Sequence, residues 1–202
     1  MTKHAILLGA ILLAGFGFQC CQDKPVRVDK NVQYVTGADE VTYLRLGTQI
    51  TDSVGARLKA NLVKAIQESG PIEAVKFCNA RAMRITNSYS RRYNTDVKRV
   101  SDRNRNESNS LNEIQTKVFS DYKEALKNGE TLSAKIAIDK EGRKNFFAPI
   151  VTGGVCLTCH GAAADMQPEL MSVIDSLYPN DKAKGYAENE LRGIWSVKFK
   201  GS

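Results

Sequence analysis

Residues 132 to 160 read LSAKIAIDKEGRKNFFAPIVTGGVCLTCH, and this stretch decides the fold. Its first part contains two short runs, 132–139 and 143–151, separated by the turn-forming residues KEG. Runs of this length and composition predict a strand, a turn and a second strand. A Cys-x-x-Cys-His sequence follows the second strand directly. The predicted hairpin therefore ends beside a cluster of thiol and imidazole groups.

The pattern before this hairpin is helical. Apolar residues recur at helical spacing at Leu44, Ile50, Val54, Leu58, Leu62 and Ile66. Gly70 and Pro71 end this helix, which is expected from about Asp39 to Glu68. Pro71 suits the first position of a second helix. The apolar stripe of that second helix consists of Val75, Cys78, Ala82, Ile85 and Tyr89.

The remaining segments complete an α+β pattern. Residues 95–102 are expected as a short strand, and Ser110 with Glu113 forms a capping box that predicts the start of another helix. Pro168 opens a short helix, and residues 191–200 form a closing strand. Because helices come first and strands later, we expect an α+β fold. In it, N-terminal helices pack on an antiparallel sheet and the Cys-x-x-Cys-His sequence lies beside that sheet.

Length and composition are those of a globular protein. The chain has 202 residues, of which 42% are hydrophobic and 25% charged, so disorder throughout is excluded. The formal net charge is +7. A basic surface fits nucleic acid, acidic lipid or an acidic protein. No nucleic-acid-binding motif is present, and we expect no nucleic-acid partner.

The N-terminus predicts export. Residues 5–18 are uncharged and apolar, long enough for a signal sequence and too short for an ordinary membrane span. Cys20 and Cys21 follow, which suggests a membrane-anchored periplasmic lipoprotein acylated at one of them. Plain cleavage and an uncleaved anchor are the alternatives. We therefore expect three parts: a signal peptide or lipoprotein signal at 1–20, a tether at 21–38 and a folded domain at 39–202.

The Cys-x-x-Cys-His sequence is the attachment signature of c-type haem. Cys156 and Cys159 would bind the two vinyl groups of one haem c covalently, and His160 would coordinate the iron from one face. Two other chemistries use the same residues. Zinc would need four ligands, with Cys78 as the fourth, and a disulfide or redox pair would join the two neighbouring cysteines.

The second axial ligand is left open by the residues alone. His4 leaves with the signal, so His160 is the only histidine of the expected domain. Sulfur ligands are the natural substitutes. The candidates are Cys78, Met83, Met166 and Met171. Cys78 and Met171 also fit as packed core residues.

Several stretches together resemble one known family. They are EAVKFCNARAMRITNSYS (73–90), RVSDRNRNESNSLNEIQTKVFSDY (99–122), the hairpin before CLTCHG, and LRGIWSVKF (191–199). The chain is similar over roughly 39–200 to the single-haem c-type, PAS-like domain family first seen in cyanobacteria, which occurs as exported proteins and as histidine-kinase sensor domains. The resemblance implies that Cys78 is the second axial ligand. Family members often carry Arg-Asn-Pro where this chain has Arg-Asn-Arg-Asn at 103–106.

Positive charge would be needed beside a ligating thiolate. Arg81 lies three residues after Cys78, so it is a candidate to approach the sulfur or a haem propionate. A basic run further along is a second candidate for contacts with propionates or with an acidic partner. It consists of Arg91, Arg92, Lys98, Arg99, Arg103 and Arg105.

Three functions compete on this evidence. Electron transfer with a separate redox partner is the first, and a partner with an acidic surface would complement the basic chain. The second is a haem-based redox or gas sensor that acts through a separate partner. A peroxidase is disfavoured because the expected domain has no second histidine to act as acid and base. The sequence thus favours an electron carrier over an enzyme.

Overall fold

The computed structural model describes residues 32–201. The predicted signal at 1–20, with Cys20, and most of the predicted tether, including Cys21, lie outside these residues. The helices and strands are β1 (Gln33–Tyr34), α1 (Ala38–Arg92), β2 (Thr95–Val100), α2 (Glu113–Lys127), β3 (Lys135–Ile138), β4 (Lys144–Val151), α3 (Gly154–His160), α4 (Pro168–Leu177) and β5 (Leu191–Phe199). No helix among residues 32–201 has the length and apolar character that a membrane span requires.

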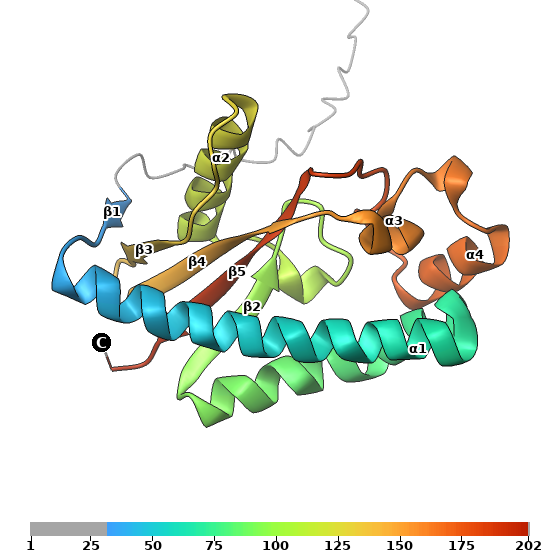
Figure 1. The fold of residues 1–202 in the computed structure, drawn as a ribbon, viewed down its shortest axis with the longest axis horizontal. Helices are drawn as coiled ribbons and strands as arrows, with labels where there is room; N and C mark the ends of the chain where they lie inside the picture. Colours follow the sequence, from blue (N-terminus) through green and yellow to red (C-terminus); the bar gives the residue numbers. More distant parts are fainter. Residues whose placement is uncertain (1–31, 202) are drawn as a thin grey trace, which may run out of the picture.

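The strands form one five-stranded antiparallel sheet in the order β1-β3-β4-β5-β2. The predicted hairpin is confirmed: β3 pairs with β4, and Ile136 lies opposite Phe146. The closing strand β5 pairs with both β4 and β2, which places it between the hairpin and the edge strand β2 (Figure 1). The predicted α+β fold class is therefore confirmed, and the arrangement is PAS-like. The sequence pattern missed β1, which lies within the stretch expected as a tether.

The long helix α1 consists of two arms. Gly70 interrupts it with a φ of 78°, in the left-handed region that glycine adopts most readily, and Pro71 begins the second arm. The predicted break between two helices is thus confirmed. In Figure 1 the second arm runs back alongside the first, so the arms, 38–69 and 71–92, form a helical hairpin. This hairpin brings residues from both ends of α1 to one side of the sheet.

Both faces of the sheet are covered. Phe146 belongs to a core cluster with Ile50 and Val54 of α1, whereas its neighbour Phe147 packs with Val118 of α2. Successive side chains of a strand point to opposite faces, so adjacent phenylalanines serve two separate cores. The alternation explains why the strand runs are apolar almost throughout. Helix α1 therefore covers one face of the sheet and α2 the other.

The start of α2 differs from the prediction. Its capping box is formed by Asn112 and Gln115: the side chain of Asn112 accepts from the Gln115 amide at 3.0 Å, and the Gln115 side chain accepts from the Asn112 amide at 2.9 Å. The predicted pair, Ser110 and Glu113, is wrong. Ser110 closes a preceding 3-10 turn, because its amide donates to Glu107, so the helix begins only after it.

Candidate functional site

The candidate site begins where β4 ends. Thr152 is buried, and its backbone amide donates to Glu190 O at 2.9 Å while its hydroxyl donates to Ala187 O at 2.6 Å. These bonds fasten the end of the strand to the loop that precedes β5. Helix α3 starts two residues later, at Gly154, and carries Cys156, Cys159 and His160. Their spacing on a helix places both thiols and the imidazole next to one another.

The imidazole of His160 is held in one tautomer. Its Nδ1 lies 2.7 Å from the carbonyl oxygen of Ala183, and a carbonyl can only accept, so Nδ1 carries the proton. Burial, and next the positive charges of Arg192 and Arg105, hold the pKa of His160 well below its usual range. The ring is therefore neutral, and its Nε2 keeps a lone pair that can bind a metal.

Tyr186 and the loop around it support the other side of His160. The Tyr186 amide donates to His160 O at 2.9 Å, and the two rings meet edge to face with centroids 6.3 Å apart. The amide of Gly185 donates to Gly161 O at 2.7 Å. The histidine is thus bonded to one loop through its backbone as well as through its side chain.

Arg105 connects this loop to α3. Its Nη2 donates to Cys159 O at 2.5 Å and lies 3.1 Å from the carboxylate of Asp181. Asp181 in turn accepts from the Ala183 amide at 2.8 Å, and the carbonyl of Ala183 accepts the hydrogen bond from His160 Nδ1. Only 1% of the Asp181 side chain and 12% of the Arg105 side chain are exposed. Arg105 therefore fixes both the thiol-bearing helix and the acceptor of His160.

Further arginines surround the imidazole. The guanidinium groups of Arg103 and Arg192 lie over the ring of Tyr186, at 3.9 Å and 5.1 Å from its centroid. Arg192 donates from Nη1 to Arg103 O at 3.2 Å, but its Nε is buried and has no hydrogen-bond partner among the described residues. The site therefore contains a buried cationic donor that the described part of the chain leaves unsatisfied.

Cys78 lies on the second arm of α1, which contacts α3. Burial raises the pKa of its thiol, and the positive charges of Arg99 and Arg105 oppose that rise. Burial also raises the pKa of Cys159; Arg105 opposes this rise and the charge of Cys78 adds to it. The structure thus brings the arm that carries Cys78 close to the Cys-x-x-Cys-His helix, because Val75 of that arm belongs to the cluster against which Cys159 packs.

The other sulfur candidates lie in different surroundings. Met166 is buried and Met171 partly buried in the cluster that α4 forms with Val75, and Cys159 packs against that cluster. Met83 is half-buried on α1. The three described cysteines are free thiols, and no three histidine, cysteine or acidic side chains of residues 32–201 converge as a metal-ion site would require.

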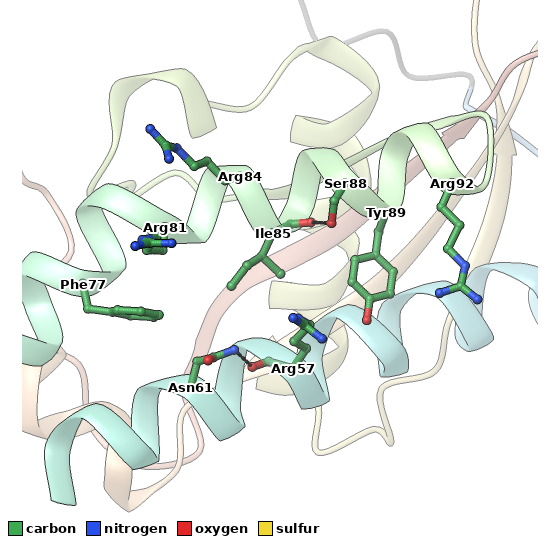
Figure 2. A pocket seen from close by; sticks show the side chains of 9 residues that line it. All are labelled: Arg57, Asn61, Phe77, Arg81, Arg84, Ile85, Ser88, Tyr89 and Arg92. Carbon is green, nitrogen blue, oxygen red and sulfur yellow. Dashed lines mark hydrogen bonds between the residues drawn. The ribbon is translucent and has the colours of Figure 1, made fainter. Parts of the chain in front are cut away.

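Arg81 occupies a different place from Cys78. It is exposed and lines a groove between the two arms of α1, together with residues of both arms (Figure 2). The positive charges that act on the Cys78 thiol are those of Arg99 and Arg105, two members of the basic run. Their strand and loop positions gave no indication in the sequence that they would meet Cys78. The roles of Asp181, Ala183 and Tyr186 were missed, because a carbonyl acceptor and a loop carboxylate leave no motif.

The fold and the site define an α+β domain with a Cys-x-x-Cys-His helix at the end of its central hairpin. A model of the Tll0287-like family matches residues 28–200, and the chain therefore belongs to that family. The crystal structure of the cyanobacterial heme-protein Tll0287 shares the fold, with a TM-score of 0.63 and 18% identity over 83% of this chain and 98% of that one. No curated protein matched the chain. The predicted family is thus confirmed.

Proposed function

We propose that this protein is an exported monohaem c-type cytochrome that acts in electron transfer. One haem c would be attached through Cys156 and Cys159, with His160 and Cys78 as the two axial ligands. The observation that carries this proposal is the state of His160: on the helix that bears both thiols, its Nδ1 donates to Ala183 and leaves Nε2 free to bind iron. The solved relative Tll0287 is a heme-protein, which supports the proposal.

The residues around the site also fit the two carboxylates of a haem. Of Arg99, Arg105 and Arg192, which all act electrostatically on His160, only Arg105 has an ion pair with a carboxylate in the described part of the chain. The buried Nε of Arg192 has no partner there. A buried cation is costly unless it is paired, so this group of arginines suits an anionic cofactor with two propionates.

A bound haem c supplies an iron that carries one electron. The chain contributes the surroundings of that iron. His160 would remain neutral because of its burial and the positive charges of Arg192 and Arg105, while its hydrogen bond to Ala183 would fix the tautomer. Burial raises the pKa of the Cys78 thiol, and the positive charges of Arg99 and Arg105 oppose that rise. A thiolate bound to the iron would favour the ferric over the ferrous state. We therefore expect a lower midpoint potential than histidine and methionine ligands would give.

The proposal includes a place and a partner. The signal-like residues 5–18, followed by Cys20 and Cys21, support a lipoprotein anchored in the periplasm. The net charge of +7 supports a redox partner with an acidic surface. In this setting the protein is an electron carrier rather than an enzyme.

Absorption spectra of the exported protein test the proposal, recorded for the ferric and ferrous forms before and after carbon monoxide. We expect c-type haem bands and a low-spin spectrum that carbon monoxide does not alter. The variant Cys156→Ser/Cys159→Ser should lose covalent haem, and Cys78→Ser should retain haem but change its ligand-dependent bands. Absence of haem from the unaltered protein would refute the proposal. Rapid carbon monoxide binding by the ferrous form would favour the sensor function over electron transfer.

A further inference from the structure

The two arms of α1 enclose a groove of about 550 Å³ on the side of the molecule where they run past each other. Its lining comes from Arg57 and Asn61 of the first arm and from Phe77, Arg81, Arg84, Ile85, Ser88, Tyr89 and Arg92 of the second. Figure 2 shows Arg57 extending from the first arm toward the second, and Arg92 extending from the second arm toward the first. Both walls therefore contribute positive charge to one hollow.

The charge of this groove is unbalanced. None of its lining residues is acidic. Its four arginines, Arg57, Arg81, Arg84 and Arg92, have no carboxylate within ion-pair distance among residues 32–201. Phe77, Ile85 and Tyr89 supply apolar surface between these charges, as Figure 2 shows. A groove with cationic walls and an apolar lining is complementary to an acidic protein segment that also carries apolar side chains.

One end of the groove adjoins the proposed haem site. Phe77 directly precedes Cys78, and Ile85 lies seven residues after Cys78, on the same face of the helix. A protein bound in the groove would thus contact Phe77, the residue that directly precedes the proposed axial ligand in the sequence.

We infer that the groove between the arms of α1 is the docking surface for an acidic segment of a redox partner. That the partner exchanges electrons with this protein rests on the proposed function, whereas the binding of an acidic segment in the groove rests only on the charge and lining of the groove. A membrane surface with anionic lipid is the competing source of negative charge. The groove favours a protein segment, because a recess with an apolar lining accepts a narrow chain better than a flat layer of headgroups.

Binding of a labelled ten-residue peptide that alternates glutamate with leucine to the full haem-loaded protein tests this inference by fluorescence anisotropy. The groove variant is Arg57→Gln/Arg81→Gln/Arg92→Gln. The matched control removes three exposed charges elsewhere, Arg45→Gln/Lys127→Gln/Lys200→Gln, for which the described residues show no ion pair. We expect the groove variant to bind at least about ten-fold more weakly and the control to change by no more than about two-fold.

Two further measurements make the test decisive. A benzophenone at the end of the peptide should crosslink to residues 77–92, and higher salt should weaken binding. Equal losses in both variants, or crosslinks elsewhere, would overturn the inference. Loss of binding to phosphatidylglycerol vesicles in the groove variant, without an effect on the peptide, would assign the groove to the membrane instead. The haem spectrum of each variant is recorded in parallel, so failure of the haem proposal would be seen separately.

Discussion

Replacement of Arg105 by methionine should destabilise the protein by about 3–5 kcal/mol. Arg105 is 12% exposed and its partner Asp181 only 1%, so the substitution would leave a buried carboxylate without its cation. It would also remove the 2.5 Å hydrogen bond to Cys159 O. Methionine is shorter than arginine but keeps an unbranched apolar stem, which limits the loss of packing that accompanies the loss of charge. The magnitude follows from the cost of an unpaired buried charge.

An exposed ion pair on the same side of the molecule provides the control. Arg103 and Glu190 lie 3.9 Å apart, with 38% and 47% of their side chains exposed. Pairs this accessible contribute at most about 1 kcal/mol. Glu190→Gln should therefore change stability by less than about 1 kcal/mol, several times less than Arg105→Met. A second variant, Asp181→Asn added to Arg105→Met, should recover at least about 1 kcal/mol, because it removes the uncompensated charge.

Urea unfolding of the full chain, followed by circular dichroism, measures all three effects. With a urea dependence of about 1–3 kcal/mol per molar, the midpoint of Arg105→Met should fall by at least about 1 M. If Arg105→Met and Glu190→Gln shift the midpoint equally, the ion pair of Arg105 and Asp181 contributes no more to stability than an exposed surface pair, and the prediction fails. If the double variant is less stable than Arg105→Met, the reasoning from the buried carboxylate is refuted.

Two other changes test the fold and the N-terminus. Gly47→Ala would place a Cβ 2.2 Å from the Phe146 ring, and thermal unfolding should show a loss of stability of about 1–3 kcal/mol. Gly55→Ala, whose Cβ would have its nearest atom at 3.5 Å, should stabilise the protein by up to about 1 kcal/mol. The reverse order of stabilities would contradict the packing of α1 on the sheet. Serine at both Cys20 and Cys21 should release the protein from the membrane fraction, and continued retention would contradict lipidation.

Local signals predicted most of the framework. The KEG turn between two apolar runs specified the β3–β4 hairpin, and Gly70 followed by Pro71 specified the break in α1, because both depend only on neighbouring residues. The start of α2 was misplaced by two residues because Ser110 and Asn112 can both cap a helix. The choice between them depends on the preceding 3-10 turn, which the pattern of apolar residues does not reveal.

The candidate site was only partly predictable. Its three motif residues are adjacent in the sequence, so spacing alone identified them. Their supports come from far away: Arg105 and Asp181 are separated by 76 positions. The Ala183 carbonyl that orients His160 belongs to a residue type with no chemical signature. Such contacts depend on the path of the loop before β5, which is set by the tertiary structure.

The two proposed iron ligands are supported very unequally. His160 is bonded through its ring to Ala183 and through its backbone to Tyr186, and Arg105 ties that loop to α3. The sulfur of Cys78 makes no hydrogen bond among the described residues. Cys78 also lies on the second arm of α1, shortly after the break at Gly70, whereas His160 follows a strand at the centre of the sheet. A ligand that is not oriented by hydrogen bonds is the easier one to displace, so any exchange at the iron would begin at Cys78. The carbon monoxide experiment therefore tests the less constrained of the two ligands.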